Sequence, residues 1–222
     1  MKYFLEQAAI VKLADSAHCG IVYIRNVSQT NIKLGLIVPR LFVAIDLPET
    51  TKDQVLTLRR DDLPPGRWAR REALHLTLHF IGDVPEAVAR AYGRALRQVE
   101  APAFDLLISG VGQFPIEARP RVIWAGVRNT PPLRALYEAV GTALESEGFR
   151  RERRRFHPHI TLMRFKKPLR RGLASRWLQA HLDFHAQPAR VEQFTLFESR
   201  LQPGGAVYIK RGVYALSSNA LV

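Results

Sequence analysis

The sequence predicts an α+β protein of two similar lobes, each an antiparallel sheet with helices outside, whose motif strands line a shared central cleft. Two observations predict it. The tetrapeptide His-apolar-Thr-Leu occurs at residues 75–78 and again at 159–162, each time within an alternating apolar run typical of a strand. Each copy is preceded by a strand and a helix and followed by another helix, an order that favours two related halves.

In the first half, apolar periodicity and turn residues set the expected elements. A strand covers 40–47, and a helix opens at Pro48-Glu49 and runs to about residue 60, because an acidic first turn suits the helix dipole. The first motif lies in a strand over 74–81 that Gly82 ends, and a helix from Pro85-Glu86 reaches about residue 99. Strands follow at 103–113 and 121–128.

The second half repeats this order. Two prolines start a helix over 131–147 and Gly148 ends it, after which the strand at 157–165 carries the second motif. A short helix at about 170–181 comes next. Strands over 188–199 and 206–216 are separated by a Pro-Gly-Gly turn, which favours a hairpin.

Residues 1–39 differ from the rest and are interpreted as an appended segment of unknown role. They are poor in arginine, contain Cys19, and end at Pro39 just before the first clean strand. A short hairpin, a helix, or an extension from an upstream start codon would each fit. Residues 40–222 form the two-lobed domain.

Charge is the unusual feature of the composition. The 222 residues include 33 Lys and Arg against 20 Asp and Glu, a net charge of +13, which favours polyanionic partners such as RNA. The densest run, residues 150–155, contains five arginines. It would attract an RNA backbone, or it is an ordinary solvated loop.

The lone cysteine, Cys19, excludes an intramolecular disulfide and a zinc site built from cysteines. This usage fits a reducing cytosol, so we expect a cytoplasmic protein. No apolar stretch approaches 18 residues and the N-terminus lacks a secretory signal, so no membrane association is expected. We further expect a monomer.

Each motif presents an imidazole and a hydroxyl on one face, because side chains i and i+2 of a strand point the same way. His75 with Thr77 and His159 with Thr161 could therefore surround one small anion. A buried structural histidine would explain one motif, but not two.

Other chemistries fit less well. Zinc could bind His75 with His79, or His157 with His159, but no Asp or Glu in either strand offers a third ligand. We therefore expect no metal, and interpret His79 and His157 as exposed or supporting residues. A nucleophilic serine elbow, a Walker loop and a dinucleotide-binding glycine motif are absent from the sequence.

From about residue 40 to its end the chain resembles the two-histidine (2H) phosphoesterase superfamily, specifically the RNA 2′,3′-cyclic phosphodiesterases, which are also known as 2′-5′ RNA ligases. The matching segments are RLFVAIDLP at 40–48, Arg67-Trp68, LHLTL at 74–78 with FIG after it, PRVIWAGV at 120–127 and FHPHITLMR at 156–164. Residues 1–39 have no counterpart in this resemblance, and position 79 is more often Lys or Arg in the family.

The resemblance implies hydrolysis of a ribose 2′,3′-cyclic phosphate to a 2′-phosphate, without metal or other cofactor. Histidine suits both proton transfers because its pKa lies near neutrality. We assign His75 as proton donor and His159 as proton acceptor, with Thr77 and Thr161 donating hydrogen bonds to the phosphate oxygens.

Three further residues are weighed as substrate ligands. Arg164 would point away from His159 in a regular strand, so it could bind phosphate only if a bulge or the strand end turned it inward. Phe42 and Trp68 could stack on a terminal base, although core packing is the alternative for Phe42. Alternative functions are 2′-5′ RNA ligation, RNA or nucleotide binding without turnover, and hydrolysis of a small cyclic phosphate.

Overall fold

The computed structural model describes residues 38–218 except 60–62, 117–118 and 204. The predicted appended segment, 1–39, falls outside the described residues apart from its last two. Within the described part of the chain no helix is long and apolar enough to span a membrane.

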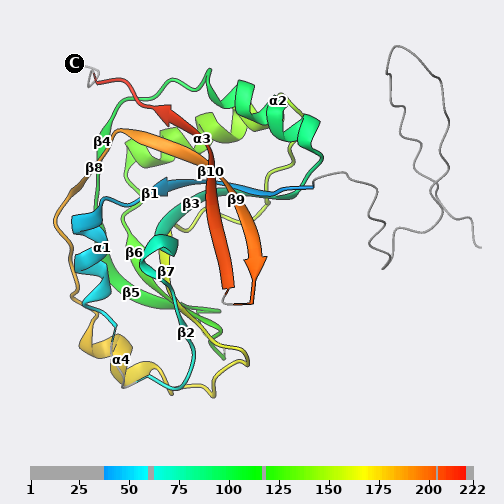
Figure 1. The fold of residues 1–222 in the computed structure, drawn as a ribbon. Coiled ribbons are helices and arrows are strands. Elements are labelled where there is room, and N and C mark those ends of the chain that lie inside the picture. The colour runs from blue at the N-terminus through cyan, green and yellow to red at the C-terminus, as the bar shows by residue number, and fades with distance from the viewer. Residues whose placement is uncertain (1–37, 60–62, 117–118, 204, 219–222) are drawn as a thin grey trace, which may run out of the picture. The chain divides into compact units, whose positions relative to one another are not determined.

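The first lobe is a four-stranded antiparallel sheet in the order β10-β9-β1-β3. Its strands are β1 (Arg40–Asp46), β3 (His75–Asp83), β9 (Gln193–Gln202) and β10 (Gly205–Ala215). The two ends of the described chain thus meet in one lobe, and β9 and β10 run side by side as the orange and red arrows of Figure 1. β1 is central, so its residues 41–45 are buried on both faces.

The second lobe has the order β7-β6-β5, with the short β2 on the other side of β7. Its strands are β2 (Arg67–Trp68), β5 (Ile108–Phe114), β6 (Val122–Val127) and β7 (His159–Arg164). A single antiparallel residue pair, Leu76 with Ile160, joins β3 of one lobe to β7 of the other. The predicted arrangement of two antiparallel lobes meeting at their motif strands is confirmed.

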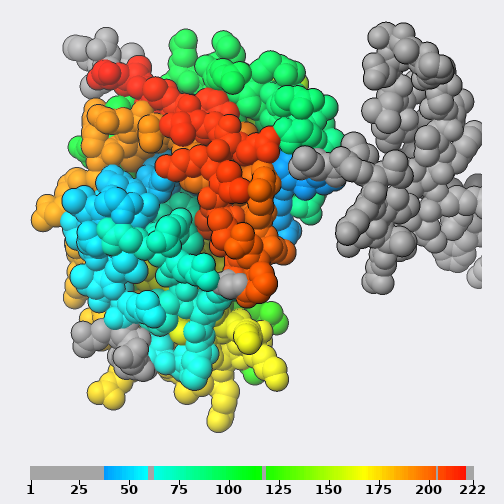
Figure 2. Space-filling view, viewed as in Figure 1, coloured from blue at the N-terminus to red at the C-terminus, as the bar shows by residue number. Residues whose placement is uncertain are grey.

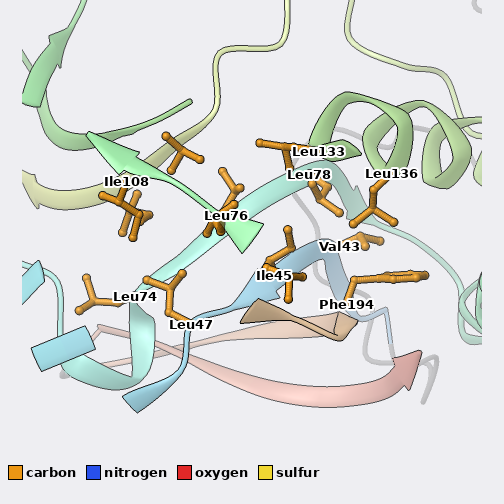
Figure 3. Packing of buried hydrophobic residues seen from close by; sticks show 14 of the residues in the cluster. Val43, Ile45, Leu47, Leu74, Leu76, Leu78, Ile108, Leu133, Leu136 and Phe194 are labelled. Carbon is orange, nitrogen blue, oxygen red and sulfur yellow. The ribbon is translucent and has the colours of Figure 1, made fainter. Parts of the chain in front are cut away.

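Helices cover one side of these sheets and build the core. They are α1 (Glu49–Leu56), α2 (Glu86–Leu96), α3 (Pro131–Glu145) and α4 (Ser175–Ala180), with a 3₁₀ turn, η1 (Arg71–Ala73). The apolar stripe of α3, including Leu133 and Leu136, packs near the inward side chains of β1 and β3, such as Val43 and Leu76 (Figure 3). The opposite face of the junction is left for polar side chains.

Two predicted strands are each divided in the structure. The segment predicted at 103–113 forms β4 (Phe104–Leu106) and β5, and the one at 188–199 forms β8 (Ala189–Val191) and β9. β4 and β8 pair with each other in a separate small sheet. The sequence predicts that Gly82 ends the first motif strand, but β3 continues to Asp83, since Gly82 and Asp83 still pair with Leu41 and Arg40 of β1. Gly82 keeps this pairing at a φ of +89°, which only glycine accepts easily.

Candidate active site

The pair Leu76 with Ile160 sets the geometry of the site. In the antiparallel register around this pair, the position of His75 lies across from Thr161 and that of Thr77 across from His159. Leu76 and Ile160 are fully buried in the core, so the four polar side chains share the other face. All four line one cleft of about 290 Å³, to which both lobes contribute.

Each motif strand carries a bulge at the leucine of its motif. Beside β1, Ala44 pairs with Thr77 and Val43 with His79, which leaves Leu78 as the extra residue. Beside β6, Trp124 pairs with Thr161 and Ile123 with Met163, which leaves Leu162. A bulge reverses the alternation of side chains beyond it.

This bulge determines where Arg164 lies. Without it Arg164 would share the core face with Leu162, but the reversal places it on the same face as His159 and Thr161, where it lines the cleft. Its Nη2 atom lies 3.5 Å from Oγ1 of Thr161. The exposed guanidinium, next to a motif threonine, is a candidate to hold a phosphate oxygen.

His75 is half-buried among aromatic rings. The rings of Phe42 and Tyr208 have centroids 4.9 and 5.1 Å from the imidazole. Burial lowers the pKa of His75 from 6.5 to about 4, while a hydrogen bond to the Ala73 carbonyl and the carboxylate of Asp46 act in the opposite direction. His75 is therefore neutral near pH 7 when no anion occupies the cleft.

The carboxylate of Asp46 lies next to His75 because these residues pair across β1 and β3. It is held by two ammonium groups, Lys52 Nζ at 3.0 Å and Lys210 Nζ at 2.8 Å. Burial raises its pKa, but the hydrogen bonds and charges of the two lysines lower it more, so the net direction is downward. Asp46 is therefore a fixed negative charge beside one of the two imidazoles.

His159 is oriented by the chain just before it. Its Nδ1 lies 2.8 Å from the carbonyl oxygen of His157, and because a carbonyl only accepts, Nδ1 donates and Nε2 is left for proton transfer. Burial lowers its pKa, His157 and Arg164 lower it further by charge, and the His157 carbonyl partly offsets them. The ring of Phe114 stands edge-on at 4.9 Å.

The two predicted aromatic ligands occupy different places. Trp68 lines the cleft and is half-buried, with its ring 6.5 Å from Trp177. Phe42 does not line it: the ring is buried, stacks on Phe197 at 5.2 Å and supports His75. The base-stacking role considered for Phe42 is therefore not favoured, because its ring already packs against Phe197 and His75.

Several residues that line the cleft are not predicted by the sequence. Tyr208 comes from β10 and Arg67 and Arg70 from the segment around β2 and η1. Figure 2 shows this cyan segment beside the orange and red β9–β10 hairpin on one face of the molecule. Nothing local in the sequence marks Tyr208, since only the pairing of β10 with β9 brings it to the site.

His79 corrects an expectation. The sequence predicts an exposed or supporting residue, but the bulge turns His79 into the core, where it is 4% exposed. Its ring stacks on Tyr137 at 4.3 Å and its Nε2 donates to the Tyr137 carbonyl at 2.8 Å. His79 therefore faces away from His75 and could not share a zinc ion with it.

His157 is exposed and supports His159 through its carbonyl, as expected of a supporting residue. Among the residues that the structure describes, no three His, Cys, Asp or Glu side chains gather in a way that could hold a metal ion.

The arginines of the run at 150–155 differ in their surroundings. Arg151 folds back onto α3, where it pairs with Glu138 and lies 3.0 Å from Glu145. Its guanidinium packs on Gly141, where a Cβ would collide with it. Arg154 and Arg155 are exposed and line a hollow beside α3. The run is therefore partly structural.

Known proteins are similar to this chain over most of its length. A model of the 2′-5′ RNA ligase superfamily matches residues 47–210. The RNA 2′,3′-cyclic phosphodiesterase of Thermotoga maritima is 34% identical over 176 residues, covering 76% of this chain and 91% of that protein. That of Methanothermobacter thermautotrophicus is 32% identical over 183 residues, covering 80% and 98%. The crystal structure of E. coli LigT complexed with 3′-AMP aligns with a TM-score of 0.66 at 30% identity, covering 82% of this chain and 99% of LigT.

Proposed function

The chain belongs to the 2′-5′ RNA ligase superfamily, and from this premise we propose that it hydrolyses 2′,3′-cyclic phosphates at RNA or nucleotide ends to 2′-phosphates. The observation that carries the proposal is the convergence of His75, Thr77, His159 and Thr161 in one cleft. Relatives that bear the name RNA 2′,3′-cyclic phosphodiesterase support it.

The reaction opens one P–O bond. Water attacks phosphorus and loses a proton, the bond to O3′ breaks, and O3′ receives a proton, leaving the phosphate on O2′. His159 takes the proton from water through Nε2, and His75 gives one to O3′. The crossed register, each histidine facing the other motif's threonine, sets the two imidazoles at opposite corners of the site, as an in-line displacement requires.

The assignment of the two roles rests on the charges near each ring. The Asp46 carboxylate favours a protonated His75. Arg164 disfavours the protonated form of both rings, and His157 adds to this effect at His159. Burial keeps the pKa of both rings low in the free protein, but the anionic cyclic phosphate adds a negative charge beside them and raises both pKa values. With substrate bound, the proton is thus held at His75, next to the carboxylate.

The remaining groups hold the phosphate and the nucleoside. Thr77 and Thr161 donate their hydroxyls to the non-bridging oxygens as negative charge grows on them, and Arg164 adds a charged donor from β7. Trp68 and Tyr208, from different lobes, border the cleft and offer rings for the terminal base. LigT, whose crystal structures hold 3′-AMP and phosphate, binds ligands of this kind.

The test is product analysis in excess EDTA. Incubating the protein with 2′,3′-cyclic AMP should yield adenosine 2′-phosphate, identified by chromatography against the 3′ isomer, at the same rate with and without the chelator. A 3′-phosphate product, or a rate that needs added metal, would contradict the proposal. A parallel incubation with cleaved tRNA halves measures joining, and hydrolysis should exceed it because the chain has no nucleotide-binding motif to supply energy.

A further inference from the structure

A second concave surface lies beside the cleft, on the His159 side. It consists of two hollows of about 480 and 320 Å³ that share Asn129, Arg155 and Phe156 as lining residues. The larger hollow also reaches Trp124 and His157. Because the His157 carbonyl holds His159, this surface, the arginine groove, begins beside the residue that orients the catalytic imidazole.

The groove is positively charged. Four exposed arginines line it, Arg128, Arg134, Arg154 and Arg155, and none forms an ion pair with any described residue. Two acids also line it, but Glu138 is already paired with Arg151, which leaves Glu152. Helix α3 starts at the groove without an acid in its first turn, so the positive end of its dipole is not compensated either.

The groove also offers flat rings, and two buried polar atoms of its lining residues lack partners. Phe156 stacks on Tyr137 with a centroid distance of 4.0 Å, and Trp124 lies at the end nearest the active site. Trp124 Nε1, a donor, and Asn129 Oδ1, an acceptor, are buried without a hydrogen-bond partner in the described part of the chain. Arginines interleaved with aromatic rings are the usual surface for single-stranded nucleic acid.

We propose that the arginine groove holds the phosphates and bases of the RNA upstream of the cyclic end, so that the preferred substrate is an RNA strand rather than a free nucleotide. The proposal rests on the proposed function. A 2′,3′-cyclic phosphate needs a 2′-hydroxyl and is the last group of its strand, so every other phosphate lies on its 5′ side. A strand that enters the cleft must therefore leave it along one surface, and the groove approaches the cleft where the ring of its lining residue Trp124 lies 6.2 Å from that of His159.

The experiment compares two substrates that end in the same nucleoside, 2′,3′-cyclic AMP and a short oligoribonucleotide with an adenosine 2′,3′-cyclic phosphate end. The variant is Arg128→Ala/Arg134→Ala/Arg155→Ala. For the oligonucleotide, kcat/KM should fall roughly tenfold or more, mainly through KM, and its dependence on log salt should flatten by about 2, at roughly 0.7 for each lost contact to a single strand. Turnover of cyclic AMP should stay unchanged.

A matched control removes the same charge elsewhere. Arg59, Arg94 and Arg176 are exposed and line none of the three hollows described above, so Arg59→Ala/Arg94→Ala/Arg176→Ala should leave both substrates nearly unaffected. Equal losses in the two triple variants would mean that only net charge matters, and an oligonucleotide rate unchanged in the groove variant would overturn the proposal.

A binding measurement distinguishes a groove that does not bind RNA from a protein that lacks the proposed activity. An RNA ending in a 3′-phosphate lacks the ring to be opened, and its affinity, measured by fluorescence anisotropy, should drop in the groove variant even if wild-type protein hydrolyses neither substrate. Polyglutamate of equal charge is the competitor. If it displaces the RNA as well as unlabelled RNA does, the groove serves acidic protein segments instead.

Discussion

The two motif strands share a sequence and a bulge, yet they bring different chemistry to the cleft. Beyond Leu78, β3 turns His79 inward and leaves Phe80 exposed beside Arg40. Beyond Leu162, β7 turns Met163 inward and places Arg164 in the cleft. The repeated motif therefore gives both strands the same backbone path. The second residue after the bulge differs, Phe80 in β3 and Arg164 in β7, so only β7 places a cation in the cleft at this position.

The surroundings of the two imidazoles differ in the same sense. The charge of Arg164 acts on both rings. His75 also has the Asp46 carboxylate across the strand pair and packs against Phe42 and Tyr208, whereas His159 donates to the carbonyl of His157 and is affected by the charge of that residue. Two equivalent positions in the sequence thus lie in different electric fields. In the proposed mechanism, these different neighbours make one of the two histidines the acid and the other the base.

The largest expected effect comes from removing either imidazole. His75→Ala and His159→Ala should each lower kcat/KM for 2′,3′-cyclic AMP by on the order of 10²–10⁴, the usual worth of a proton-transfer group. The pH profiles should distinguish them: His159→Ala loses the limb that rises with pH, and His75→Ala the limb that falls. The exposed His185 provides the control, since His185→Ala should keep wild-type rates. Two variants with the same residual profile would argue against separate roles.

The positions after the bulges provide the next comparison. Arg164→Ala should lower kcat/KM by roughly tenfold to a hundredfold, as expected for a charged hydrogen bond to phosphate, and Arg164→Lys should recover part of the loss. The equivalent position on β3 serves as the control, and Phe80→Ala should change the rate less than about twofold. Steady-state assays with the cyclic nucleotide measure both, and similar losses at the two positions would mean that Arg164 does not contact the substrate.

A smaller effect is expected from the hydroxyls. Thr77→Val and Thr161→Val keep the side-chain shape and remove one neutral donor, so each should lower kcat by roughly two- to tenfold. Thr195→Val is the matched control, because Thr195 is fully buried in β9 and its hydroxyl has no partner among the described residues. A loss in the control as large as in the motif variants would point to a disturbed sheet rather than to lost hydrogen bonds.

Much of this arrangement can be predicted from the sequence because it depends on local periodicity. Alternation in two strands is enough to put His75 with Thr77 and His159 with Thr161 on one face, and Pro and Gly positions locate most element ends. The meeting of β3 with β7 is also expected from the repeat. The alternation and the element ends depend on neighbours close in the chain, whereas the β3–β7 meeting is a distant pairing that only the repeat makes predictable.

What cannot be predicted depends on pairing between distant segments. The bulges arise where β3 meets β1 and β7 meets β6. From the sequence, Arg164 reaches the cleft only if a bulge or the strand end turns it inward, and the burial of His79 is not predicted. Tyr208 reaches the cleft through a strand order that joins the two ends of the described chain. The capture of Arg151 by α3 likewise depends on a helix that precedes it.

The smallest expected effect tests the inward position after each bulge, where β3 has His79 and β7 has Met163. Burial lowers the pKa of His79, with the Tyr137 carbonyl only partly offsetting it. Between the unfolded pKa near 6.5 and this lowered value, the unfolded chain binds the proton and the folded protein does not, so stability falls as pH drops through this range. His79→Met should make the loss of unfolding free energy between pH 7 and 5 shallower, by at most about 1.4 kcal/mol per pH unit, in urea titrations at the two pH values. His185→Ala removes an exposed imidazole instead and is the matched control. An unchanged slope in His79→Met would mean that the buried ring accepts its proton in the folded protein as readily as in the unfolded chain.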